Sequence, residues 1–253
     1  CARIIALERL ERLRQWTESV LPAPLVTLEP ASADASFRRY FRATMSHGSL
    51  VVMDAPPSHE DCRPFLHIAR LFRQAGANTP EIHAENLDEG FLLLSDFGST
   101  TYLAALDDGR ADTLYRDANA ALVKIQSASR AGELPDYDAE LLMREMRLFP
   151  DWYVARHLKL DLTDAQRTTL EQTFAAVLDN NLAQARVYVH RDWHSRNLMV
   201  TEADNPGVLD FQDAVYGPIT YDLVSIYKDA YISWDEARVL DWVIRYWQSA
   251  RRA

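Results

Sequence analysis

The chain has 253 residues, enough for one large domain or two lobes with a substantial core. Hydrophobic residues make up 48% of it and charged residues 25%, as is usual for a soluble globular protein. With 37 acidic and 27 basic side chains the net charge is -10, which argues against nucleic acid or an anionic membrane surface as the main partner.

The sequence lacks the signals of export and of membrane insertion. No apolar run approaches the roughly 18 residues of a membrane-spanning helix, and there is no signal peptide. Only Cys1 and Cys62 are present, so no disulfide framework is indicated and a reducing cytoplasm is the expected compartment. Cys1 at the first position fits a lipoprotein cleavage site, but the missing Met and the immediate helix favour a chain without its natural start. The last helix runs into residues 251–253 without a cap, a pattern typical of truncation.

The predicted elements start with a helix over residues 7–20, whose apolar stripe stops at Pro22 and Pro24. A second helix is predicted from residue 58 to residue 74, where Gly76 closes it. Runs rich in β-branched and apolar residues predict five strands, at residues 25–28, 37–44, 50–53, 81–86 and 91–95. The first part of the chain is therefore predicted to be a five-strand unit with a helix after its third strand.

Beyond residue 98 the apolar spacing changes to that of helices. Further helices are predicted at residues 114–125, 138–149, 163–178 and 233–247. Pro150 is predicted to start a further turn. Thr163 with Gln166, and Ser233 with Glu236, have the spacing of capping boxes.

A strand, a loop and a hairpin interrupt these helices. The strand is predicted at residues 187–189, and the hairpin pairs residues 198–200 with 207–209 around the turn 204–207. Asn197 stands before the first hairpin strand and Asp210 after the second. We expect these two side chains to be close enough to share an ion.

The loop before the hairpin, residues 190–197, reads His-Arg-Asp-Trp-His-Ser-Arg-Asn, which is H-R-D-x-x-x-x-N. Followed by an acidic residue that closes an apolar strand, it has the active-site arrangement of protein-kinase-like phosphotransferases. Asp192 is predicted to orient or accept the proton of an attacking hydroxyl. Asn197 and Asp210 are predicted to hold magnesium against ATP phosphates. A solvated hairpin with turn residues is the alternative, and it leaves Asp192 unexplained.

Residues 95–98 read Ser-Asp-Phe-Gly, which contains the kinase metal motif D-F-G. They lie before the catalytic loop, however, and follow the buried strand 91–94. In a two-lobed kinase this position is the hinge, where backbone groups meet adenine. Asp96 is therefore predicted to be a cofactor-binding hinge residue, and Asp210 the metal ligand.

Residues 190–197, 207–218 and 221–223 resemble the aminoglycoside phosphotransferase (APH)-like branch of the kinase superfold. Within that branch they most resemble the bacterial cell-wall amino-sugar kinases. Those enzymes phosphorylate the anomeric hydroxyl of N-acetylmuramic acid and N-acetylglucosamine during peptidoglycan recycling. The likeness extends over residues 34–54 and 61–96, so it covers most of the chain.

The resemblance implies an α+β, two-lobed protein-kinase-like fold. Residues 1–96 would be the small antiparallel-sheet lobe, which binds the nucleotide. Residues 97–253 would be the larger, mainly helical lobe, which carries catalysis and acceptor binding and is truncated at its end. The implied cofactors are ATP and Mg2+, and the implied partner is a small sugar acceptor, with a monomer as the expected oligomeric state.

Carried over to this chain, the family's site makes Asp192 the catalytic base and Asn197 and Asp210 the magnesium ligands, with Asn197 also facing the nucleotide. His190 and Asp222 would brace the catalytic loop. Residues flanking the site are predicted to contact the acceptor, because amides, carboxylates and aromatic rings suit a sugar. They are Trp193, His194, Gln212, Asp213 and Tyr216.

The segment where a glycine-rich phosphate loop is usual contains no glycine: residues 33–40 read Ala-Asp-Ala-Ser-Phe-Arg-Arg-Tyr. The hydroxyl of Ser36, backbone amides and Arg38 or Arg39 are predicted to hold phosphate oxygens instead. The alternative is a plain strand with solvated arginines.

The ion pair that usually positions ATP is also missing. The strand expected to carry its lysine reads Val-Val-Met-Asp over residues 51–54, and the helix position of its glutamate falls near Phe65. Losing both partners together is coherent, because a buried charge without its partner is costly. Either an arginine from the strand 38–42 takes over the lysine's role, or the chain is a pseudokinase. The intact Asp192, Asn197 and Asp210 favour an active enzyme.

The predicted reaction is in-line transfer of the ATP γ-phosphoryl group to a sugar hydroxyl. A kinase for an aminoglycoside, choline or homoserine is the alternative enzyme, and a silent nucleotide-binding scaffold is the alternative from another class. Protein kinase activity is disfavoured, because the chain has no A-P-E sequence after Asp210 and little room for a peptide platform before residues 221–223.

Overall fold

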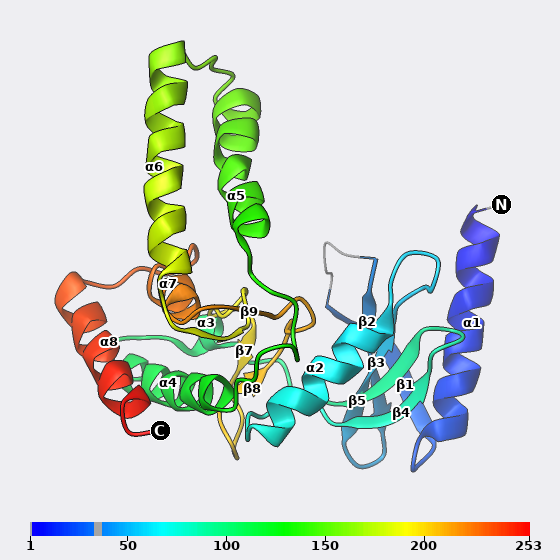
Figure 1. Ribbon diagram of the computed structural model, residues 1–253. Coiled ribbons are helices and arrows are strands. Elements are labelled where there is room, and N and C mark those ends of the chain that lie inside the picture. Colours follow the sequence, from blue (N-terminus) through cyan, green and yellow to red (C-terminus); the bar gives the residue numbers. More distant parts are fainter. Residues whose placement is uncertain (1, 33–36) are drawn as a thin grey trace. The chain divides into compact units, whose positions relative to one another are not determined.

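The computed structural model describes residues 2–32 and 37–253 of the chain. It divides into two compact units: the first comprises Cys1–Ala121 and Arg196–Asp213, and the second comprises Leu122–Ser195 and Ala214–Ala253 (Figure 1). The mixture of an antiparallel sheet with helices confirms the predicted α+β class. The functional division into lobes 1–96 and 97–253 stays a prediction. Within the described part of the chain, no helix has both the length and the apolar character needed to cross a membrane.

The first unit is built around a five-stranded antiparallel sheet with strand order β1-β2-β3-β5-β4. Its elements are α1 (Ala2–Val20), β1 (Leu25–Ser32), β2 (Arg39–Met45), β3 (Ser49–Asp54), α2 (Cys62–Gln74), β4 (Ile82–Asn86), β5 (Phe91–Ser95), α3 (Tyr102–Ala105), the first part of α4 (Ala111–Ser127), β7 (Leu198–Met199) and β8 (Gly207–Val208). The five sheet strands and both long helices of this part were predicted from the sequence, and all of them are confirmed.

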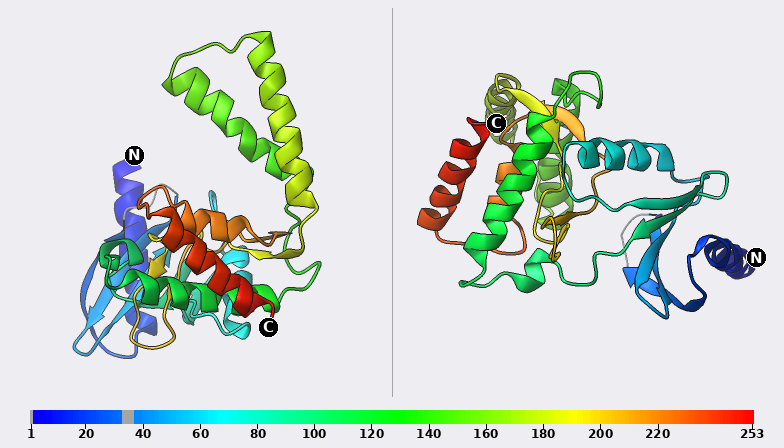
Figure 2. Two further views of the ribbon diagram at one scale, coloured as in Figure 1. Left: turned by 90° about the vertical axis from the view of Figure 1, so that its left-hand side faces the viewer. Right: turned by 90° about the horizontal axis from the view of Figure 1, so that it is seen from below.

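One face of the sheet packs against α1, which lies beside it in Figure 2. Leu13 of α1 is fully buried among Phe41, Val52, Phe91 and Leu93. Because side chains alternate along a strand, the neighbours of these residues in β5 point to the other face, and they are buried as well. β5 is therefore buried on both faces of the sheet, which accounts for its uninterrupted apolar run.

The hairpin of β7 and β8 is fastened to the rest of the first unit by backbone contacts. The N–H of Val208 donates to the carbonyl of Asn78 at 2.8 Å, and the N–H of Val200 donates to the carbonyl of Thr100 at 2.9 Å. A Cβ on Gly207 would lie 2.6 Å from the Phe97 ring, so this position has room only for glycine. Phe97, which belongs to the D-F-G sequence at residues 96–98, thus packs against the hairpin that leads to Asp210.

The second unit is mainly helical around a short two-stranded antiparallel sheet. Its elements are the end of α4, α5 (Ala139–Leu148), the π-helix η1 (Phe149–His157), α6 (Asp164–Leu182), β6 (Arg186–Val189), β9 (Val215–Pro218), α7 (Tyr221–Tyr227) and α8 (Glu236–Ala250). Figure 1 shows α5 continuing into η1 and the chain returning through α6, so these elements form a helical hairpin.

The predicted boundaries in the second unit hold in most places. Asp138 caps α5, and Thr163 with Gln166 forms the predicted capping box. The capping box at Ser233 is wrong: α8 begins at Glu236, and the carboxylate of Asp235 accepts from the N–H of Arg238 at 3.1 Å. An acceptor adjacent to the first turn reaches its N–H groups, whereas Ser233 stands too far back.

Residues 149–157 form a π-helix, where only a further turn was predicted. Pro150 has no N–H with which to continue the α-helical hydrogen bonds of α5, and the backbone adopts the wider pattern from this point. The short elements β9 and α7 had no prediction. Four and seven residues, respectively, are too few to show a clear period.

Candidate active site

The two predicted metal ligands lie together in the first unit. Because β7 and β8 are antiparallel, the residue before β7 and the residues after β8 meet at the same end of the hairpin. The N–H of Leu209 donates to the carbonyl of Asn197 at 2.9 Å, and the Asn197 amide donates to a carboxylate oxygen of Asp210 at 3.3 Å. Asp210 has a φ of 62°, a left-handed conformation that is uncommon outside glycine and often marks a functional site.

Two of the predicted acceptor residues join this pair. The Gln212 amide donates to Asp210 at 2.8 Å and to Asp213 at 3.3 Å, so it bridges the two carboxylates. Its Oε1 atom is buried and has no hydrogen-bond partner among the described residues. The result is a cluster of carboxylate and amide oxygens, the hard ligands that magnesium prefers. The donor set of Asn197 and Asp210 therefore fits the cation that was predicted.

The helix α2 reaches this segment through aromatic rings instead of charge. Phe65, at the position where a glutamate was expected, lies 4.8 Å from the ring of Phe211, and Phe72 lies 6.3 Å from it. Phe211 is fully buried and directly follows Asp210. Apolar contact thus ties α2 to the segment that follows the predicted metal ligand Asp210, and Phe65 supplies a ring contact where a glutamate was expected.

The end of β3, where a lysine was expected nearby, carries a buried carboxylate. Asp54 is fully buried and is paired with Arg9 of α1 at 2.6 Å and with Arg39 of β2. Arg38, predicted to bind the cofactor, pairs with Glu60 at 3.4 Å. Ser36, predicted to act beside it, lies outside the described residues. If one of these arginines binds a phosphate of ATP, it must either leave its carboxylate partner or contact the carboxylate and the phosphate together.

The Asp96 side chain is engaged in a local network at the end of β5. It accepts hydrogen bonds from Arg42 at 2.6 Å, from the Ser49 hydroxyl at 2.7 Å and from the N–H of Gly98 at 2.8 Å. Burial by itself would raise the pKa of Asp96, but these donors outweigh it and hold that pKa below its ordinary value. The Asp96 carboxylate fixes the segment after β5. The contact of this segment's backbone groups with adenine stays a prediction.

Residues 190–195 of the predicted catalytic loop belong to the second unit, and two carboxylates brace their backbone. Asp222 of α7 is fully buried and accepts from the N–H groups of His190 at 2.8 Å and Arg191 at 3.0 Å. Asp229 accepts from the N–H of Ser195 at 2.9 Å. The expected bracing role of Asp222 therefore agrees with its contacts. The convergence of Asp192 on Asn197 and Asp210 stays a prediction.

The pKa of Asp222 leads to a prediction for stability. Burial raises this pKa to about 7, assisted by the charge of Asp192 and opposed by the two backbone hydrogen bonds. The folded state then holds a proton that the unfolded state loses above about pH 4, so this group's contribution to stability falls between about pH 4 and pH 7. Asp222→Asn does not titrate. Urea unfolding across this range should show the free energy of unfolding of the wild type falling relative to the variant, and a rising difference would contradict this.

The other predicted acceptor residues lie in the second unit. The His194 ring contacts the Tyr231 ring edge-on at 5.5 Å. Tyr216 is on β9, and the guanidinium of Arg186 lies 4.6 Å from the centre of its ring. The backbone of Tyr216 accepts from the N–H of Tyr137 at 2.9 Å. The roles of His194 and Tyr216 toward an acceptor stay predictions, and Trp193, expected beside them, is fully buried.

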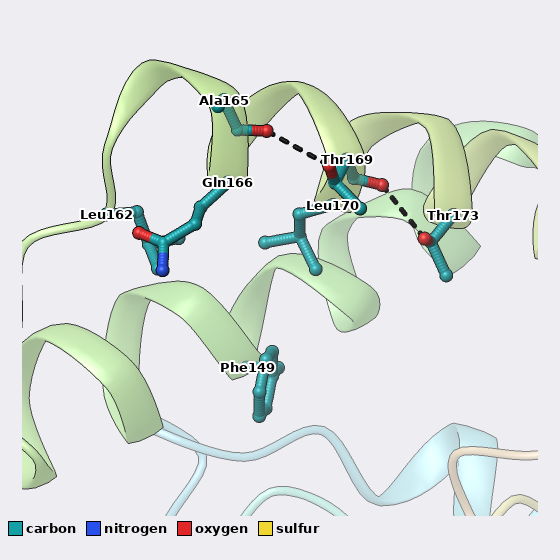
Figure 3. Close-up of a pocket in the computed structure, with 7 residues that line it drawn as sticks. All are labelled: Phe149, Leu162, Ala165, Gln166, Thr169, Leu170 and Thr173. Atoms are coloured by element: carbon teal, nitrogen blue, oxygen red, sulfur yellow. Dashed lines mark hydrogen bonds between the residues drawn. The ribbon is translucent and has the colours of Figure 1, made fainter.

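A hollow of about 350 Å3 lies between the arms of the helical hairpin (Figure 3). Figure 3 shows Phe149 on one arm and the side chains of α6 on the other. Its lining residues are Phe149, Leu162, Ala165, Gln166, Thr169, Leu170 and Thr173. None of them ionises near neutral pH, so the side chains that line this hollow offer no general acid or base.

Comparison with known proteins decides the family. A model of the phosphotransferase enzyme family, APH, matches residues 27–253. The chain belongs to this family. The match includes the catalytic loop and both predicted metal ligands, so the predicted membership in this phosphotransferase family is confirmed.

The relatives of this APH chain include three of similar identity. An N-acetylmuramate/N-acetylglucosamine kinase from Pseudomonas putida is 48% identical, over 97% of this chain and 75% of the relative. A protein of the same name from Pseudomonas aeruginosa is 49% identical over 96% and 74%. Another from Neisseria meningitidis is 48% identical over 98% and 75%. The predicted resemblance to amino-sugar kinases is therefore confirmed.

Solved structures share the fold of this APH chain at low sequence identity. The ADP-bound aminoglycoside phosphotransferase APH(2'')-Ib has a TM-score of 0.66 at 14% identity, covering 95% of this chain and 84% of that one. The choline kinase LicA from Streptococcus pneumoniae has a TM-score of 0.65 at 11% identity, covering 93% and 79%. These likenesses confirm the predicted protein-kinase-like fold.

Some residues that support the catalytic loop escaped prediction from the sequence. Glu145 pairs with Arg191 from 46 positions away, and Asp229 accepts from Ser195 from 34 positions away. Both are acidic residues within or beside helices, where a solvated position is the default expectation. No local pattern distinguishes them, because their partners come together only in the folded unit.

Proposed function

We propose that this APH chain transfers the γ-phosphoryl group of ATP to the anomeric hydroxyl of N-acetylmuramic acid and N-acetylglucosamine, in the cytoplasm, during peptidoglycan recycling. The observation that carries the proposal is the near 50% identity to three kinases named for these two sugars, over almost the whole chain. The chain keeps the residue types that the reaction needs at Asp192, Asn197 and Asp210.

Asp192 orients the sugar hydroxyl and takes its proton as the bond to phosphorus forms. It needs a defined backbone position to do so, and the carboxylates of Asp222 and Asp229 hold the N–H groups around it. Precise placement matters, because phosphoryl transfer through a loose transition state gains most of its rate from positioning.

Asn197 and Asp210 hold Mg2+ against the ATP phosphates. When bound, the ion supplies positive charge that neutralises the transferring phosphoryl group. Gln212 keeps the Asp210 carboxylate in place through its 2.8 Å hydrogen bond, much as residues behind metal ligands do elsewhere. The lysine's usual role toward the phosphates falls to an arginine of residues 38–42. Ser36 and Arg38 are also proposed to contact ATP.

The acceptor is recognised by His194, Gln212, Asp213 and Tyr216. Their amide, carboxylate and aromatic groups match a sugar that offers hydroxyls along its edge and an apolar face. The enzyme works as a monomer.

The test is ADP formation with ATP and Mg2+ against a panel of acceptors: the two amino sugars, glucosamine, an aminoglycoside, choline and homoserine. We expect turnover with N-acetylmuramic acid and N-acetylglucosamine and background rates with the rest. Turnover with only an aminoglycoside, choline or homoserine would replace the proposed acceptor. Binding of ATP without turnover on any acceptor would identify a silent nucleotide-binding scaffold.

A further inference from the structure

Glu145 of α5 collects three donors on one carboxylate. The guanidinium of Arg191 donates to Oε1, and the hydroxyl of Tyr137 donates to Oε2. The Tyr221 hydroxyl lies 3.5 Å from the same Oε2 atom. Glu145 and Arg191 are 23% and 26% exposed, so this ion pair is only partly screened by water.

The tyrosines remain donors under ordinary conditions. Burial raises the pKa of Tyr137 above its ordinary value, and the nearby Glu145 carboxylate acts in the same direction. Burial also raises the pKa of Tyr221. Both phenols therefore keep their protons, and each has Glu145 as an acceptor.

The Tyr137 side of the cluster is held in a fixed place. Tyr137 is 1% exposed, and its backbone N–H donates to the carbonyl of Tyr216 at 2.9 Å. A Cβ on Gly217 would lie 2.6 Å from the Cβ of Tyr137, so the two backbones approach as closely as glycine allows. Glu145 is thus anchored to the β6–β9 sheet as well as to the loop.

Arg191 joins this cluster to the catalytic base. It directly precedes Asp192 and has a φ of 77°, a left-handed conformation that is unfavourable for an arginine. Asp222 holds the Arg191 N–H from one side. The side chain is held from the other side by Glu145, so acidic residues hold both the backbone and the side chain in this conformation.

We propose that Glu145 is a positioning residue for the phosphoryl transfer, which holds Arg191, and through it Asp192, in the catalytic conformation. Arg191 then stays paired with Glu145 during the reaction. The inference rests on the proposed role of Asp192 as the base.

The test compares Glu145→Gln with Glu140→Gln, a matched change at an exposed position on the same helix. We expect Glu145→Gln to lower kcat about 10- to 100-fold, as the loss of a charge-assisted contact implies, with the KM for ATP within about twofold of the wild type. Glu140→Gln should change neither. Glu145→Asp, which keeps the charge, should recover part of the lost kcat.

A double-mutant cycle separates positioning from simple destabilisation. If Glu145 acts through Arg191, then Arg191→Gln combined with Glu145→Gln should be no slower than the worse single variant. Losses of kcat that multiply in the double variant would overturn the inference. So would an unchanged kcat in Glu145→Gln, or a loss of kcat no larger than the fraction of that variant that is unfolded. Should Glu145→Gln not fold, Tyr137→Phe removes one donor alone and should lower kcat severalfold, and an unchanged kcat there would overturn it.

Failure of this inference can be distinguished from failure of the proposed function. If Asp192→Asn is inactive while Glu145→Gln has wild-type kcat, Asp192 is supported as the base and the positioning role of Glu145 is wrong. If Asp192→Asn keeps wild-type kcat, the proposed role of Asp192 as the base is itself wrong.

Discussion

Replacing Asp192 with asparagine is expected to lower kcat by about 100- to 10,000-fold, the usual contribution of a positioned general base. The amide keeps the shape of the side chain but cannot take the proton of the acceptor hydroxyl. The KM for ATP should change little, because the nucleotide phosphates are assigned to other residues. Steady-state kinetics of sugar phosphorylation, with ATP and sugar varied in turn, give both constants.

The matched control is Asp161→Asn, the same chemical change at an exposed position of the second unit. It should leave kcat and both KM values unchanged. If Asp192→Asn turned over sugar as fast as this control, Asp192 would have no part in the chemistry. Thermal unfolding of both variants shows whether a lost rate reflects a lost fold.

Asp54→Asn is expected to lower the free energy of unfolding by about 3 kcal/mol, near the lower end of the range for breaking a buried ion pair. The carboxylate is fully buried and neutralises Arg9, which is 13% exposed, and Arg39, which is 41% exposed. An amide would leave the largely buried Arg9 charge with only Glu89, at 3.7 Å, as an acidic partner. The partial exposure of Arg39 lets water replace its partner, so most of the cost comes from Arg9.

Urea unfolding measures this loss, and Glu85→Gln is the control. Glu85 pairs with Arg70 at 3.2 Å, but both side chains are largely exposed, so the expected loss is about 0–1 kcal/mol. Equal losses in the two variants would mean that burial of Asp54 contributes nothing. A larger loss of unfolding free energy for Asp54→Asn would show that the ion pairs of Asp54 with Arg9 and Arg39 help to hold α1 against the sheet.

Local patterns were sufficient to predict most of the fold. The run Phe91–Leu94 is apolar throughout and forms the buried β5, and the capping box at Thr163 starts α6 as predicted. Where two signals competed, the sequence was less decisive. Ser233 and Asp235 are both good capping residues, and only the position of the first helical turn selected Asp235.

The candidate site divides in the same way between local and distant contacts. The spacing of Asn197 and Asp210 around a hairpin predicted their closeness, because an antiparallel pair brings those two positions to one end. The contact of Phe65 with Phe211 has no such local basis. It appears only when α2 and the segment after β8 pack into one unit, and a single sequence carries no record of that packing.

The proposed reaction forms a bond between the sugar's anomeric oxygen and the γ-phosphorus of ATP. The direct measurement is phosphorus NMR of the product made from N-acetylglucosamine labelled with oxygen-18 at C1. We predict one phosphate monoester on C1 whose signal carries the isotope shift of a bridging oxygen-18. An unshifted signal, or phosphate on any other carbon, would contradict the account.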